Sequence, residues 1–176
     1  GGRCTKTVLC SSSCNDITVL PGSDLVCSAH FDNHVRLWDP RSYKLAETIE
    51  NCHESQVTSV CVTPDGNGLL TSGRDSKLKI IDMRTYRATH TFACPDFIAS
   101  INHYKACISP DSKYVAAGSS SRICSNNQTL CVWDMKQKVV ARLCDTHHGP
   151  ITCCTWHPDG TFLATTGHDG QLITWR

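Results

Sequence analysis

The chain has 176 residues, of which 40% are hydrophobic, so it is long and apolar enough to bury a core. Its 17 basic and 16 acidic residues leave a net charge of +1, which gives no electrostatic case for binding nucleic acid or an anionic membrane. No apolar run approaches the roughly 20 residues of a membrane span and no signal peptide is visible, so we expect a cytoplasmic protein without direct membrane insertion.

One short segment recurs four times, at residues 35–39, 78–82, 130–134 and 172–176. The first, third and fourth copies carry Trp at their fourth position, and the second copy has Ile81 there. The steps between these fourth positions are 43, 52 and 42 residues. A period in the low forties that closes on Trp-Asp is typical of a β-propeller blade. Blades must stack, because a single sheet cannot bury both of its faces.

Taken in chain order, the repeats predict one separate strand followed by four blades. Residues 3–9 occupy the phase of the fourth strand of a preceding blade. Turns that contain Pro-Asp join first and second strands, and no helical period occurs, which indicates an all-β fold. The predicted blades are residues 14–50, 53–93, 104–144 and 147–176, of which the last lacks its fourth strand.

The polar residues of these units resemble the WD-repeat family over nearly the whole chain. In that family a His before the first strand, a Ser or Thr in the second strand, a turn Asp and the Trp form a hydrogen-bonded chain inside each blade. The third unit keeps Trp133 and has no turn Asp. The resemblance assigns the complete set His147, Thr165, Asp169 and Trp175 to the fourth unit, His53, Thr71 and Asp75 to the second, and Ser28, Asp32 and Trp38, without the His, to the first.

The same residue types also occur in hydrolase triads, which combine a nucleophile, a base and an orienting carboxylate. Here the arrangement recurs once per blade in degraded form, whereas a catalytic site needs one intact copy in a cleft. We therefore predict no catalytic residues and no enzymatic activity.

The 13 cysteines contain no Cys-x-x-Cys pair, the spacing that most structural zinc sites use. We predict no metal site and no cofactor; His147 and His148 would bind a metal only with a further ligand from another blade. The alternative for Cys10, Cys14 and Cys124, outside the regular strands, is redox sensing or adventitious metal binding. The cysteines expected to be small buried hydrophobes in strands are Cys27, Cys61, Cys107, Cys131, Cys153 and Cys154.

The 52-residue step comes from a polar insertion at residues 119–128, between the second and third strands of its unit. Two interpretations stay open: the insertion reaches over a partner-binding face, or it is tolerated without a partner. The glycosylation pattern that begins at Asn127 is interpreted as a chance match in a cytosolic chain.

The residues between the repeat landmarks resemble those of the C-terminal propeller of autophagy-related protein 16-like proteins. In that family too, an Ile-Asp pair stands where this chain has Ile81 and Asp82. The segments that carry this resemblance are residues 12–17, 30–32, 72–75, 79–85 and 109–119. It implies a WD40-type β-propeller of about four blades that forms part of a seven-bladed ring. The alternative is a closed four-bladed ring in which residues 3–9 complete the last blade.

The resemblance also implies a non-catalytic scaffold in autophagy, a recruitment module that helps to target the lipidation machinery for a ubiquitin-like protein to membranes. Its implied partners are receptor tails, the vacuolar proton pump and, through the full-length protein, the autophagy conjugation complex. It would act at autophagosome precursor or endolysosomal membranes. The alternative is an adaptor of another complex, such as a substrate receptor of a ubiquitin ligase.

The residues that precede the turn Asp are expected on the rim used for partners, namely Phe31, Arg74 and His168. An exposed Phe is a typical contact anchor, and the alternative is that Phe31 is partly buried against a neighbouring loop. The resemblance places a recruitment Phe at this position and a recruitment Lys where this chain has Gln56, which puts the pump interaction in doubt.

Overall fold

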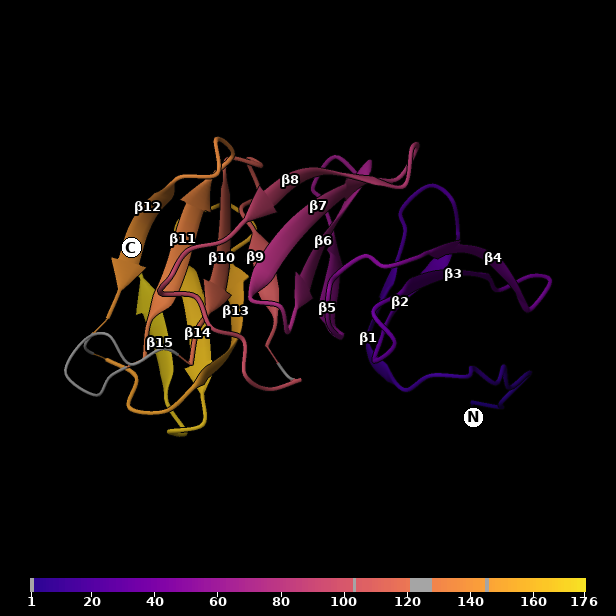
Figure 1. The fold of residues 1–176 in the computed structure, drawn as a ribbon, viewed down its shortest axis with the longest axis horizontal. Helices are drawn as coiled ribbons and strands as arrows, with labels where there is room; N and C mark the ends of the chain where they lie inside the picture. The colour runs from indigo at the N-terminus through magenta and orange to yellow at the C-terminus, as the bar shows by residue number, and fades with distance from the viewer. Residues whose placement is uncertain (1, 103, 121–127, 145) are drawn as a thin grey trace.

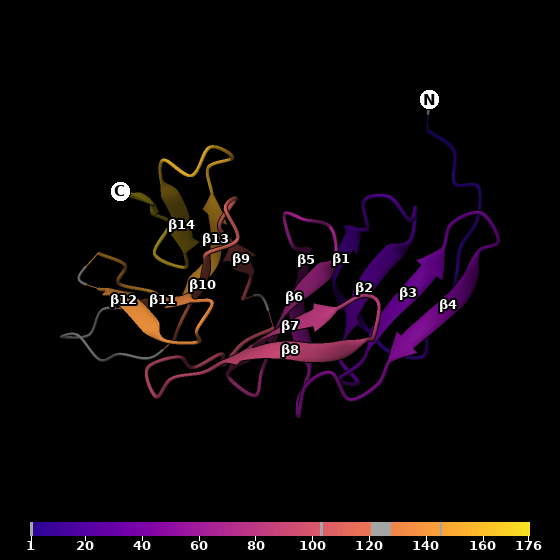
Figure 2. The same ribbon diagram turned by 90° about the horizontal axis from the view of Figure 1, so that it is seen from above.

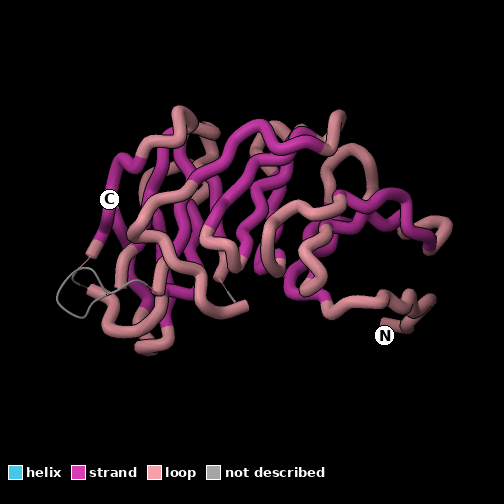
Figure 3. The backbone as a smooth tube through the Cα atoms, in the orientation of Figure 1, coloured by secondary structure: helices cyan, strands magenta, loops and turns pink. Residues whose placement is uncertain are grey.

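The computed structural model describes residues 2–102, 104–120, 128–144 and 146–176, which form four antiparallel sheets (Figure 1). The described residues contain strands and loops without a helix (Figure 3), which confirms the predicted all-β repeat fold.

The first sheet contains β1 (Cys14–Val19), β2 (Val26–His30), β3 (Val35–Asp39) and β4 (Lys44–Ile49). The second contains β5 (Val57–Val62), β6 (Gly68–Gly73), β7 (Lys77–Asp82) and β8 (Arg87–Phe92). The third contains β9 (Ala106–Ile108), β10 (Tyr114–Gly118), β11 (Leu130–Asp134) and β12 (Val139–Leu143), and the fourth contains β13 (Ile151–Trp156), β14 (Leu163–Gly167) and β15 (Leu172–Trp175).

The sheets follow one another along an open arc, as a view from above shows (Figure 2). The first strand of each sheet contacts that of the next, so β1, β5, β9 and β13 lie along the inner side. Within each sheet the strands are paired in chain order, and this leaves the last strand of each four-stranded sheet on the outer side. The structure therefore has the arrangement of a partial β-propeller.

Three hydrophobic cores hold the sheets together, and each lies between two neighbours. Leu37 of the first sheet packs in one core with Leu69 and Ile81 of the second. Trp133 of the third sheet packs with Leu70 of the second, and a smaller core joins the third and fourth sheets. Each sheet buries its apolar faces only against its neighbours, and this packing between sheets stabilises the stacked arrangement.

A repeated tight turn sets the hairpin between the first and second strands in three sheets. The backbone N–H of its fourth residue donates to the carbonyl of its first, at 2.8 Å, in the turns 63–66, 109–112 and 157–160. That fourth residue has positive φ, of +74° at Gly66 and +78° at Gly160, and Ser112 adopts +57° in the third sheet. Glycine reaches this backbone region without the steric cost that a side chain imposes.

Residues 3–9 were expected to be a fourth strand, but they form no strand and are exposed. A strand is held by hydrogen bonds to a neighbouring strand, and residues 3–9 pair with no described strand. The last sheet has three strands, so residues 3–9 do not complete it and the closed four-bladed ring does not form.

The insertion predicted at residues 119–128 lies largely outside the described residues, as do Cys124 and Asn127. Its two described ends are anchored: Ser119 and Gln128 are buried, and the Ser119 hydroxyl donates to the Asp96 carbonyl at 2.8 Å. Within the described ranges, the chain contains no helix of the length and apolarity that a bilayer crossing requires.

Candidate functional site

The fourth sheet brings its four expected polar residues into one hydrogen-bonded chain. The indole Nε1 of Trp175 donates to Thr165 Oγ1 at 2.9 Å, and the same hydroxyl lies 2.8 Å from His147 Nε2. His147 Nδ1 lies 2.9 Å from the carboxylate of Asp169. If Nδ1 carries the ring proton, every donor in the chain meets an acceptor, because the Thr165 hydroxyl can then donate to Nε2.

The second sheet repeats this arrangement without the indole. His53 Nδ1 lies 2.9 Å from Asp75 Oδ1, and His53 Nε2 lies 2.9 Å from Thr71 Oγ1. Ile81 is buried at the position of the Trp. Burial raises the pKa of the Asp75 carboxyl, but hydrogen bonds from His53 and from the backbone outweigh it, so that the pKa lies below its ordinary value.

The first sheet differs from the expected set, because its His comes from within the second strand. Ser28 Oγ accepts a hydrogen bond from Trp38 Nε1 at 2.7 Å and lies 2.7 Å from His30 Nε2. Ser28 and His30 share one face of β2, since residues i and i+2 of a strand point the same way. Asp32 does not join this chain: the Arg36 guanidinium donates to both of its oxygens and holds the pKa of its carboxyl at about 2.

The third sheet has the Trp without the chain. Trp133 pairs with Val115 in the same register in which Trp175 pairs with Leu163, so Ala117 occupies the position of the hydroxyl. The buried Nε1 of Trp133 has no hydrogen-bond partner among the described residues. Its ring instead contacts the ring of Phe97 edge-on, with centroids 5.3 Å apart.

These chains cross-link strands inside the sheets. The hydroxyls of Thr71 and Thr165 belong to buried residues, and the Thr165 oxygen is already an acceptor for Trp175. A nucleophile needs a path to its substrate, which such burial does not offer. Satisfying buried polar groups in this way stabilises the sheets.

The four residues expected on the partner face, Phe31, Gln56, Arg74 and His168, are hereafter the loop rim. One backbone hydrogen bond recurs there in three sheets. The N–H of Phe31 donates to the Ser13 carbonyl at 3.0 Å, that of Arg74 to Gln56 at 2.9 Å, and that of His168 to Pro150 at 3.0 Å. Each bond ties the turn between second and third strands to the loop that enters the sheet.

The side chains of the loop rim differ in how they are held. Phe31 is 49% exposed, so it presents apolar surface to solvent. The Arg74 guanidinium donates to the Ser100 carbonyl at 2.7 Å and thereby fixes the loop that leads into the third sheet. Gln56 is half-buried, with an Oε1 that has no partner among the described residues. Phe31 is therefore the rim side chain best suited to anchor a partner.

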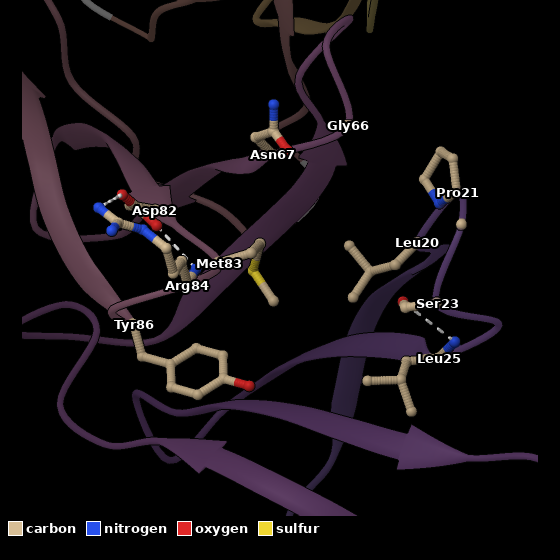
Figure 4. A pocket seen from close by; sticks show the side chains of 11 residues that line it. Leu20, Pro21, Ser23, Leu25, Gly66, Asn67, Asp82, Met83, Arg84 and Tyr86 are labelled. Atoms are coloured by element: carbon tan, nitrogen blue, oxygen red, sulfur yellow. Dashed lines mark hydrogen bonds and ion pairs between the residues drawn. The ribbon is translucent and has the colours of Figure 1, made fainter.

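A cavity of about 510 Å³ lies at the opposite ends of the first two sheets (Figure 4). Leu20 and Leu25 come from the turn between β1 and β2, and Met83 and Tyr86 from the turn between β7 and β8; their side chains face a common space. This cavity could not be predicted from the sequence, because it depends on how two turns from different sheets meet.

Metal-binding side chains are not gathered in the described part of the chain, where no group of three or more His, Cys, Asp or Glu could hold an ion. The ring of His147 is engaged by Asp169 and Thr165, and the backbone N–H of His148 donates to Asp169 at 2.9 Å. Cys10 and Cys14 are both exposed, and Cys14 begins β1, so the expectation that it lies outside the regular strands was wrong.

Comparison with known proteins gives matches along the whole chain. The family model "WD domain, G-beta repeat" matches residues 2–39, 44–82, 89–134 and 138–176. Protein tipD of Dictyostelium discoideum is 36% identical over 180 residues, which cover 99% of the chain and 28% of that protein. Autophagy-related protein 16 of Arabidopsis thaliana is 36% identical over 99% of the chain and 33% of its own length. Autophagic-related protein 16.2 of Caenorhabditis elegans is 30% identical over 98% of the chain and 32% of its own length. The chain thus spans about a third of these relatives.

Proposed function

The chain belongs to the WD-repeat family, and from this membership together with the similarity to autophagy-related protein 16 we propose that it is a non-catalytic recruitment module of an autophagy scaffold. In this proposal it helps to bring the lipidation machinery for a ubiquitin-like protein to membranes during autophagosome formation. The module itself contacts protein partners, and the conjugation complex is bound by other parts of a longer protein. We place its action in the cytoplasm, at autophagosome precursor or endolysosomal membranes.

The similarity to autophagy-related protein 16 supports the assignment to autophagy. The matched region includes the loops between strands as well as the strands, since the alignments cover 98–99% of the chain. Autophagy-related protein 16 is 36% identical over 99% of the chain, whereas a guanine nucleotide-binding protein subunit beta is 30% identical over 86% of it. Both similarities therefore support the fold, and the higher identity and coverage of the match to autophagy-related protein 16 favour a role in autophagy.

The single observation that carries an interaction role is the exposed Phe31. Its backbone is fixed by the hydrogen bond to Ser13, and its phenyl ring is half-exposed at the edge of a rigid sheet. An aromatic side chain held in this way loses little conformational entropy on binding and brings a large apolar area. Such residues typically dominate the affinity of an interface.

The chemistry of the loop rim favours receptor tails as partners over the vacuolar proton pump. A peptide with an apolar side chain can cover Phe31, and the guanidinium of Arg74 is already engaged with Ser100. The resemblance associates pump recruitment with a Lys at the position of Gln56, and an amide does not supply that positive charge.

The test compares two alanine variants in the full-length protein. Phe31→Ala removes the exposed ring, and Leu45→Ala is the matched control, because Leu45 is 48% exposed on the outer strand of the same sheet. We expect Phe31→Ala to weaken co-purification of receptor tails by about 30-fold, the effect of a 2 kcal/mol hot spot. Leu45→Ala should bind as the unchanged protein does.

The conjugation complex should co-purify equally with both variants. Absence of every autophagy conjugate and membrane receptor from the unchanged full-length protein would contradict the proposal. Co-purification of a ubiquitin-ligase core instead would favour the alternative of a substrate receptor.

A further inference from the structure

Two cysteines from neighbouring sheets lie close together on the inner side of the arc. Cys107 is in β9 and Cys154 is in β13, 47 residues apart in the chain, and their Sγ atoms are 3.3 Å apart. A disulfide bond has an S–S length of about 2.05 Å, so the two sulfur atoms need to approach by about 1.3 Å.

The backbone around the pair is fixed, so this proximity is built into the packing of the two sheets. The N–H of Lys105 donates to the Thr152 carbonyl at 2.9 Å and holds the start of β9 against β13. Cys154 Sγ also lies 3.4 Å from the Lys105 carbonyl and 3.3 Å from the Ala116 carbonyl.

From the inner side a small molecule can reach the half-buried Cys107, beside which Cys154 is buried. Cys107 and Cys154 line a cavity of about 380 Å³ between the first strands, together with Asp16 and Lys105. A second close pair, Cys94 and Cys131, has Sγ atoms 3.9 Å apart but does not line this cavity. The pair Cys107 and Cys154 therefore has the shorter Sγ–Sγ distance and is also the pair that lines this cavity.

We propose that Cys107 and Cys154 form a redox-modification site, at which a peroxide closes a reversible disulfide between the third and fourth sheets. One thiolate attacks a peroxide oxygen, and the O–O bond breaks to give a sulfenic acid and one water. The second thiol then displaces the sulfenic oxygen as a second water. Two thiols and one hydrogen peroxide thus yield one disulfide and two waters, the sulfur atoms being oxidised and the peroxide reduced.

The rate of closure should depend on pH. The hydrogen bond to Cys154 and burial both raise the pKa of the Cys107 thiol. Thiolates are the nucleophiles, so the raised pKa makes the reaction slow near neutral pH and faster at alkaline pH. The site would therefore respond to sustained rather than brief oxidation.

Closure would also stabilise the chain, because a bond between residues 107 and 154 restricts the unfolded state. The expected consequence is a rise of several degrees in the unfolding temperature of the oxidised protein, reversed by a thiol reductant. A bond between residues of two sheets would in addition hold these blades in their present relative position.

The test is peptide mapping after treatment of the dilute, reduced chain with hydrogen peroxide, followed by alkylation of the remaining thiols. Tryptic cleavage places Cys107 alone in peptide 106–113 and Cys154 in peptide 143–176. We expect these peptides to be cross-linked in monomeric protein and to separate on reduction. The cross-link should persist in Cys153→Ser and disappear in Cys154→Ser, whose hydroxyl can occupy the same polar contacts.

Three outcomes would overturn the proposal. The first is that peptide 106–113 is recovered only alkylated or singly oxidised at peroxide levels that consume Cys10 and Cys14. The second is a cross-link that depends on Cys153 rather than Cys154. The third is a bond between Cys94 and Cys131 in the absence of one at Cys107. Because mapping of the unchanged chain already decides the first and third, the test does not depend on whether a variant folds.

Discussion

Replacement of Asp75 by Asn should reveal how strongly the buried polar chain stabilises the second sheet. The Asp75 side chain is 5% exposed, and its carboxylate accepts hydrogen bonds from three donors. These are His53 Nδ1 at 2.9 Å, the backbone N–H of Glu54 at 3.0 Å and that of Lys77 at 3.3 Å. Asn keeps the shape of the side chain but offers one acceptor oxygen, so its amide group must face one of the donors.

The magnitude follows from two losses. A hydrogen bond to a charged group contributes about 1.5–3 kcal/mol, compared with about 0.5–1.5 kcal/mol for a neutral one. A buried donor left without an acceptor costs about 1–3 kcal/mol more. We therefore expect Asp75→Asn to lower the free energy of unfolding by about 3 kcal/mol.

The assay is equilibrium unfolding in urea, followed by circular dichroism and tryptophan fluorescence. Asp24→Asn is the matched control, because Asp24 is an exposed carboxylate that pairs with the exposed Arg41. Exposed ion pairs contribute at most about 1 kcal/mol, so this control should change little. If the two variants lose the same stability, the buried polar chain does not stabilise the sheet and the reasoning fails.

Three further predictions concern titration and the indole of the third sheet. Burial raises the pKa of Asp75 and Asp169, but hydrogen bonds outweigh it, so both are lowered; their contribution is present above the unfolded value of about 3.9 and lost in more acidic solution. The urea midpoint should fall between pH 5 and 3, less steeply in the double Asn variant. Burial lowers the pKa of His30 below the unfolded value of about 6.5, so stability should also fall from pH 7 to 5, and His30→Gln should flatten this slope. Ala117→Ser offers Trp133 Nε1 an acceptor and should raise the free energy of unfolding by about 1 kcal/mol; a decrease would show that crowding prevails.

The sequence predicted the fold well because the repeat encodes it directly. The positions of Trp38, Trp133 and Trp175 follow a period that only stacked four-stranded sheets explain, and the three cores lie between neighbouring sheets as such stacking requires. Residues 3–9 did not follow the pattern. Their strand phase was readable, but a strand also needs hydrogen bonds to a neighbouring strand, and residues 3–9 pair with no described strand.

The polar chains were predictable where the His, the hydroxyl and the turn Asp all stand at their usual positions, as in the second and fourth sheets. His147 and Thr165 lie in contact as expected, whereas Ser28 contacts His30, which lies two residues further along the same strand. Because residues i and i+2 of a strand share a face, the sequence of β2 could have indicated the contact between Ser28 and His30. The family motif indicated Asp32 instead. Contacts between sheets, such as Cys107 with Cys154, have no signal in a single sequence because they depend on the angle at which sheets pack.

Lipidation in cells is the most direct test of whether Phe31 of the loop rim serves to recruit the lipidation machinery. The measurement is the amount of membrane-bound, lipidated ubiquitin-like protein in cells whose only full-length copy carries Phe31→Ala, compared with Leu45→Ala. We expect a large loss of lipidated protein in the first variant and none in the second, with equal protein levels. Equal lipidation in both variants would contradict a recruitment role for the loop rim.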